Sequence, residues 1–156
     1  MKLTQNHYTF VFGLLLALAF YLRLDALAEQ QRVSPNGNDG SLEFQKYAEH
    51  LLDYTLKGER FPPGTVMHMP VFSALLAGVF SLFDRSAYVQ YATTLVVSMG
   101  QLVVLFWLVR QLYGVGWGVI AVFLLAINAE VINDAVQGGS VPLLILVLLG
   151  LLVMLV

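Results

Sequence analysis

Carboxylates gather in one polar stretch of an otherwise apolar chain. Hydrophobic residues make up 58% of the sequence, yet the segment 23–60 holds seven of the ten acidic residues. Within it, Asp39 follows a loop rich in Pro, Asn and Gly, and Glu43 comes one helical turn later. A carboxylate beside an apolar surface has its charged form disfavoured, which raises its basicity. Asp39 and Glu43 are therefore candidates for a general base.

The same residues have a purely structural interpretation. Asp39 or Ser41 can cap the helix that the following residues predict, which stabilises a helix by roughly 1 kcal/mol. One turn can hold both a cap and a reactive carboxylate, so the two interpretations stay open together.

Three basic or titratable side chains follow at the end of this polar stretch. Lys57 and Arg60 lie just before the turn Phe61-Pro62-Pro63-Gly64 and could hold a lipid phosphate by charge-assisted hydrogen bonds. His68 begins an apolar run, where an ionisable group at membrane depth points to a functional contact. The alternatives are an interfacial basic face for the two cations and a packed, hydrogen-bonded histidine.

A second polar group lies between two apolar runs near the C-terminal end. It comprises Glu130, Asn133, Asp134 and Gln137. Asp134 is a candidate for the far wall of a substrate site, and the alternative is an ordinary polar connection. A metal requires several converging oxygen ligands, so no cofactor is established, and a divalent metal stays an open alternative.

Composition places the chain in the membrane class. Charged residues make up 12% of the sequence and the mean hydropathy is +0.76, against a charged fraction of about 25% in soluble domains. The net charge of −2 argues against a nucleic-acid partner. The chain has no cysteine, which excludes disulfides and thiolate chemistry. The sequence therefore predicts an all-α polytopic helical bundle in a membrane.

Charge-free runs of about 20 residues locate the expected spans. Apolar residues around 44–55 recur at helical spacing and predict an amphipathic, juxtamembrane helix. The complete expected order is span 1 over 7–24, an extracytoplasmic loop over 25–87 with helices near 41–57 and 65–83, span 2 over 88–109, span 3 over 115–129, and span 4 over 139–156. The last run reaches Val156, so we expect a fragment of a longer protein.

Topology depends on whether 65–83 spans the membrane or lies along its interface. Arg23, Lys46 and the other cations of the first loop oppose the positive-inside rule if that loop is short. The rule weakens for loops beyond about 60 residues, so an interfacial 65–83 removes the conflict. We therefore expect a cell-membrane protein with a cytoplasmic N-terminus and with Asp39 and Asp134 on the same, outer side. A signal peptide cleaved after Ala26-Leu27-Ala28 is the alternative to an uncleaved anchor.

The order of short motifs resembles the GT-C glycosyltransferases, polytopic enzymes that use polyprenyl-phosphate sugars. The motifs are YLRL at the end of the first run, E-F-x-x-Y-A-x-x-L in the loop helix, P-P-G, M-x-M-P-V-F-S-A-L-L-A, R-Q-L-Y-G and A-I-N-A. Protein O-mannosyltransferases and aminoarabinose transferases belong to this family. The resemblance covers nearly the whole chain but only the N-terminal part of the family fold.

The resemblance implies transfer of a sugar from a membrane-bound polyprenyl-phosphate donor to an extracytoplasmic acceptor, which is a lipid, glycan or protein. It places the loop acid at Asp39, with Glu43 and Asp25 as rivals, because the spacing to Phe44 departs from the family pattern. The family's second acid falls near Ser140, one to two turns after Asp134. The family's active site also draws on later loops, so we expect the 156 residues alone to be inactive. A small non-catalytic membrane protein, such as an assembly or transporter subunit, is the alternative.

Overall fold

A computed structural model describes residues 5–33, 39–58 and 70–155. These residues form seven α-helices, with no β-strand in the described ranges. The helices are α1 (Gln5–Val33), α2 (Asp39–Lys57), α3 (Pro70–Phe80), α4 (Ala87–Tyr113), α5 (Val115–Ala126), α6 (Ala129–Val136) and α7 (Val141–Leu155). The predicted all-α class is confirmed for this part of the chain.

Two of these helices are long and apolar enough to cross a membrane. They are the 26-residue segment His7–Arg32 of α1 and the 27 residues Ala87–Tyr113 of α4. At 1.5 Å per residue each exceeds the roughly 30 Å of a bilayer core. The pair α5 and α6 meets the same test only as one span, and it is bent by 62°. The long helices support the predicted membrane class.

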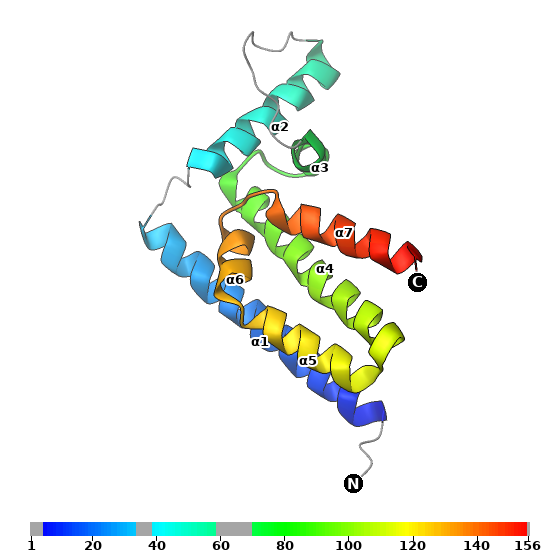
Figure 1. The fold of residues 1–156 in the computed structure, drawn as a ribbon. Coiled ribbons are helices and arrows are strands. Elements are labelled where there is room, and N and C mark those ends of the chain that lie inside the picture. The colour runs from blue at the N-terminus through cyan, green and yellow to red at the C-terminus, as the bar shows by residue number, and fades with distance from the viewer. Residues whose placement is uncertain (1–4, 34–38, 59–69, 156) are drawn as a thin grey trace.

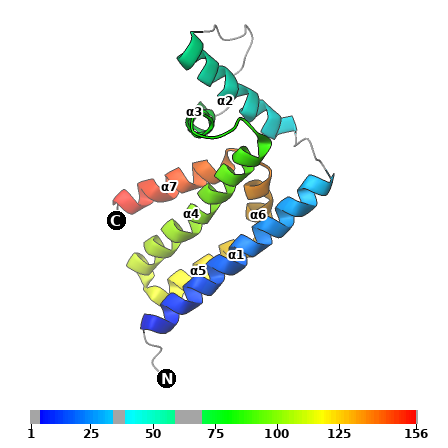
Figure 2. The same ribbon diagram turned by 180° about the vertical axis from the view of Figure 1, so that it is seen from behind.

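The helices divide into two neighbouring groups (Figure 1). Helices α1, α4 and α5 lie alongside one another, and the turn between α4 and α5 lies at the same end as the N-terminus in both views (Figures 1 and 2). Helices α2 and α3 lie at the opposite end, beside the start of α4. The loop between the two long helices therefore folds over one end of the molecule.

Small residues allow close packing of the long helices. Ala19 of α1, Leu102 of α4 and Ala126 of α5 are fully buried in one apolar cluster. A Cβ atom on Gly118 of α5 would lie 3.0 Å from the ring of Phe106 on α4. The helices of the α4–α5 hairpin thus approach closely at Gly118, as small residues commonly allow between membrane helices.

A separate apolar cluster joins α2 to α3. Ala48 and Leu52 of α2 are buried against Phe72, Leu76 and other side chains of α3. The rings of Phe44 and Phe72 meet edge to face, with centroids 5.4 Å apart, a favourable aromatic geometry. The expected apolar face of α2 thus packs on another helix from this chain.

Several helix limits differ from the expected ones. Helix α1 continues to Val33, well past the expected end at 24, and α2 begins at Asp39. The expected helix over 115–129 is interrupted after Ala126, because Asn128 starts a new helix. Its Oδ1 accepts hydrogen bonds from the backbone N–H groups of Glu130 at 2.9 Å and Val131 at 3.2 Å. This side-chain cap replaces backbone bonds that a continuous helix would need.

The expected helix over 65–83 is shorter in its described part. Helix α3 contains 11 residues, or about 17 Å at 1.5 Å per residue. That length is roughly half of a bilayer core. Residues 65–69 lie outside the described ranges.

Candidate functional site

The candidate base residues lie at the start of α2. Asp39 is the first residue of the helix, and its side chain lies outside the described part of the structure. Glu43 is exposed in the following turn. Two of the candidate phosphate contacts, Arg60 and His68, also lie outside the described residues. Of the two acids at the start of α2, the structure therefore describes the side chain of Glu43.

Glu43 has a tyrosine as its neighbour one turn along the helix. The side chain of Tyr47 is buried, and its hydroxyl has no hydrogen-bond partner within the described residues. Burial, and secondarily the charge of Glu43, raise the pKa of Tyr47. The tyrosine therefore stays protonated at neutral pH and keeps a hydrogen to donate. The sequence did not predict this pairing.

The third candidate phosphate contact, Lys57, lies beside an acid of its own helix. Its Nζ is 3.1 Å from Oδ1 of Asp53, and Nη1 of Arg85 donates to the same oxygen at 2.9 Å. The hydrogen bonds from Lys57 and then Arg85 hold the pKa of Asp53 below its ordinary value. Lys57 thus has a counter-charge within this chain.

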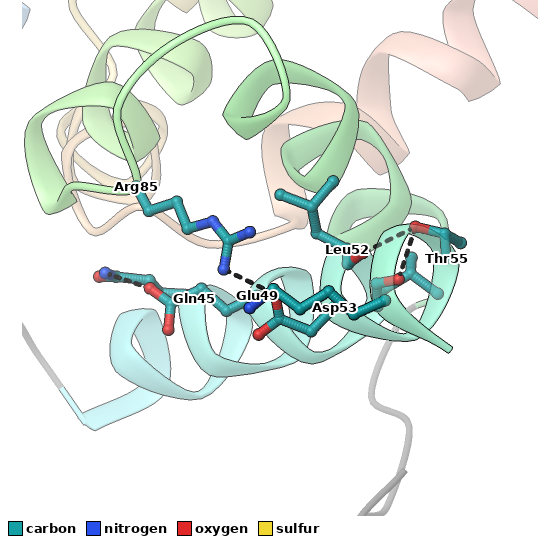
Figure 3. A network of polar contacts seen from close by, with 8 residues as sticks. Gln45, Glu49, Leu52, Asp53, Thr55 and Arg85 are labelled. Carbon is teal, nitrogen blue, oxygen red and sulfur yellow. Dashed lines mark hydrogen bonds and ion pairs between the residues drawn. The ribbon is translucent and has the colours of Figure 1, made fainter. Parts of the chain in front are cut away.

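The Arg85 contact also fixes the position of α2. Arg85 belongs to the turn between α3 and α4 and reaches across to Asp53 on α2 (Figure 3). The two residues are 32 positions apart in the sequence. The ion pair therefore ties the helix that carries Asp39 and Glu43 to the start of a candidate span.

Asp134 lies on a different helix from the other candidate acids. It is half-buried on α6, and Glu130, one turn earlier, is exposed. Within the described residues, no hydrogen bond or ion pair joins Asp134 to α2, and no three Asp, Glu, His or Cys side chains converge as a metal would require. Asp134 is therefore placed apart from Asp53 and its cations.

Ser140, the position expected for a second acid, lines a groove between α3 and α7. Its side chain is buried. The groove has a volume of ≈ 190 Å³ and is otherwise lined by Val71, Phe72, Leu143, Leu144 and Val147. A serine in an apolar groove is a hydrogen-bonding group, and none of the described residues that line the groove is a carboxylate.

A buried polar row on α4 was not predicted from the sequence. It comprises Gln90, Thr94, Ser98 and Gln101, each at most 1% exposed. The spacing of four, four and three residues places them on one face of the helix. Nε2 of Gln90 donates to the carbonyl of Gly138 at 2.7 Å, and Nε2 of Gln101 donates to the carbonyl of Pro142. The row therefore binds the backbone at the start of α7.

Arg23 of α1 joins this polar row and is itself fully buried. Its Nε donates to Oγ of Ser98 at 2.9 Å, and its Nη1 donates to the carbonyl of Ala19 at 3.0 Å. The remaining Nη2 has no partner in the described part of the chain. We expected Arg23 among the cations of the exported loop, and the structure instead buries it between helices. A buried ionisable residue in a candidate span is typical of a functional or structural constraint.

The aromatic side chains divide between the interior and the surface. The sequence suggests Tyr47, Tyr54, Trp107 and Trp117 as anchors at the membrane interface. The last three are exposed, whereas Tyr47 is buried against neighbouring helices. The expectation for Tyr47 is therefore wrong, because its side chain is buried within the chain and not exposed as an anchor would be.

Comparisons of the chain with protein-family models, with curated proteins and with solved structures found no match.

Proposed function

We propose that this chain is part of a membrane glycosyltransferase that moves a sugar from a polyprenyl-phosphate donor to an extracytoplasmic acceptor. The observation that carries the proposal is the placement of α2. This helix is polar and has carboxylates in its first turns. The Asp53–Arg85 contact attaches it to the start of α4, a long apolar helix. Acceptor chemistry at a membrane surface requires this combination of a carboxylate and a nearby bilayer.

In the proposed reaction, Asp39 takes the proton of the acceptor hydroxyl. The acceptor oxygen forms a bond to the anomeric carbon of the sugar as the bond from that carbon to the phosphate oxygen breaks. The leaving group is polyprenyl phosphate, whose negative charge requires cations. Arg60 and His68 would supply contacts to that phosphate. Lys57, which already has Asp53 as its neighbour, would contribute less.

Glu43 is the alternative base, one turn after Asp39 and exposed. The hydroxyl of Tyr47, one further turn along α2, is buried, so it would reach a bound sugar or phosphate only after its surroundings open. Asp134 would face the acceptor from α6. The proposed topology has a cytoplasmic N-terminus and an extracytoplasmic segment 25–87. The position of α2 and α3 at the end remote from the N-terminus supports it (Figure 1).

The test is donor consumption by the full-length protein in membranes. The donors are polyprenyl-phosphate mannose and polyprenyl-phosphate aminoarabinose, and released polyprenyl phosphate is measured by mass spectrometry. Loss of a general base lowers rates by about 10²–10⁴, so Asp39→Asn should lower donor consumption by that factor. Glu43→Gln tests the rival, and Glu29→Gln, an exposed acid at the end of α1, is the matched control.

Wild-type rates in both Asp39→Asn and Glu43→Gln would overturn the assignment of the base to α2. Failure of the wild-type protein to consume either donor would instead favour a non-catalytic membrane protein.

A further inference from the structure

A second groove lies between α3 and α4, on the outer surface of both helices. Its volume is ≈ 440 Å³. The residues that line it are Leu75, Val79 and Phe83 from the α3 side and Val89, Ala92, Thr93, Val96 and Val97 from α4. Residues three or four positions apart on each side share one face, so the groove has apolar side chains on both of its sides.

The described lining has no polar side chain that would need a hydrogen bond from a ligand. Among the described residues of the lining, Thr93 alone has a polar side chain, and its Oγ1 donates to the carbonyl of Val89 at 2.7 Å. The hydroxyl is therefore satisfied inside α4, which leaves methyl and aromatic groups to face the groove. A polar ligand would lose its water here without replacement, which costs free energy. An apolar chain has no hydrogen bonds to water, so it does not incur this cost.

The groove is continuous with the outward face of a candidate span. Val96 is 67% exposed, and Val103, two turns further along α4, is also exposed on the same face. In a bilayer, that face of α4 contacts lipid hydrocarbon. Phe83, which also lines the groove, is followed in the chain by the charged residues Asp84 and Arg85. The groove thus runs from a charged turn into an apolar face.

We propose that this groove binds an acyl chain of a bilayer phospholipid. The chain would lie between α3 and α4, with its headgroup at the turn that holds Asp84 and Arg85. The described part of α3 contains 11 residues, and α2 packs against its buried face. The acyl chain would cover the other face and anchor the α2–α3 pair to the membrane. This proposal is independent of the proposed sugar transfer.

The experiment uses the full chain in phosphatidylcholine nanodiscs that contain phosphatidylcholine with a diazirine on one acyl chain. After illumination, adducts are mapped by mass spectrometry of peptides. An acyl chain in the bilayer is already out of water, so a preference for the groove comes from van der Waals contact with two helices instead of one. Adducts on the groove residues should therefore exceed those around Val103.

Two alanine-to-tryptophan variants form a matched pair. Ala92→Trp fills the groove and should remove the excess of adducts there. Ala121→Trp fills a different apolar groove, beside Tyr113 and Trp117, and should leave adducts between α3 and α4 unchanged. Thr93→Val keeps the shape of the groove and should also leave them unchanged, which gives a result even where Ala92→Trp does not fold.

Two outcomes would overturn the proposal. Equal labelling of the groove and the Val103 face would show that no chain is bound specifically. Displacement of the adducts by a stoichiometric amount of polyprenyl phosphate would reassign the groove to a polyprenyl chain.

Discussion

Nε of Arg23 donates a hydrogen bond to Oγ of Ser98 at 2.9 Å, and so joins α1 to α4 across 75 positions of sequence. Both side chains are fully buried. A buried donor that loses its partner keeps its full desolvation cost, whereas replacing both partners by apolar groups is close to neutral. Replacing Ser98 alone should therefore change the free energy of unfolding more than replacing both residues.

We expect Ser98→Ala to destabilise the protein by about 1–3 kcal/mol, because Nε of Arg23 would lose its acceptor. Replacing a buried charged group by an apolar side chain is often neutral or stabilising, so Arg23→Met should abolish the effect of Ser98→Ala in the double variant. Thermal unfolding in detergent measures the cycle. Ser81→Ala, at an exposed serine, is the control. Additive effects in the double variant would show that the bond contributes nothing.

The attachment of α2 to α4 should weaken in acid. The pKa of Asp53 is lower in the folded state than its unfolded value near 3.9, because Lys57 and Arg85 stabilise its charge. The contribution of the pair is therefore fully present above the unfolded pKa and is lost as the pH falls through the folded pKa. Spin labels on His50 and Tyr88 would report this as a broader distance distribution at low pH.

The Asp53→Asn variant should give the broad distribution of distances between the two spin labels already at neutral pH. Acid should then cause no further broadening through residue 53. High salt should act in the same direction on the wild type, because the pair is partly exposed and therefore screened. A variant whose acid response equals that of the wild type would assign the response to other groups.

Two glycines of α5 should respond in opposite ways to alanine. The Cβ of Gly118→Ala would lie 3.0–3.2 Å from Phe106, so the ring and backbone of Phe106 must shift by a few tenths of an ångström, at a cost of about 1–3 kcal/mol. Gly116 has open space around its Cβ position, so Gly116→Ala should stabilise the helix by roughly 0.5–1 kcal/mol. The difference in melting temperature between the two variants measures the close approach. Equal effects would contradict it.

The proposed topology can be tested by labelling, because the chain has no cysteine of its own. Single cysteines at the exposed positions Tyr54, Leu112 and Glu130 are treated in intact cells with a membrane-impermeant maleimide. We expect labelling at 54 and 130, and labelling at 112 only after the cells are opened. Labelling of 54 and 130 from opposite sides would contradict the proposed placement of the acids on one side.

The sequence by itself determined the features that depend on local composition. Long apolar runs predicted α1 and α4, because a run of about 20 apolar residues forms a helix that buries its own backbone bonds. The 3.6-residue period placed Phe44, Ala48 and Leu52 on the packed face of α2. These features require no knowledge of what lies nearby in space.

Only the tertiary structure decided which groups far apart in sequence meet. Arg23 was expected in the exported loop, because one charge after an apolar run gives no sign that α4 supplies Ser98 as a partner. The row from Gln90 to Gln101 was detectable as polar residues on one helical face, but its target, the backbone at the start of α7, was not. The pairing of Asp53 with Arg85 likewise needs α3 to fold back on α2. Contacts between residues far apart in the sequence depend on how the helices pack, and a local pattern of residues does not determine that packing.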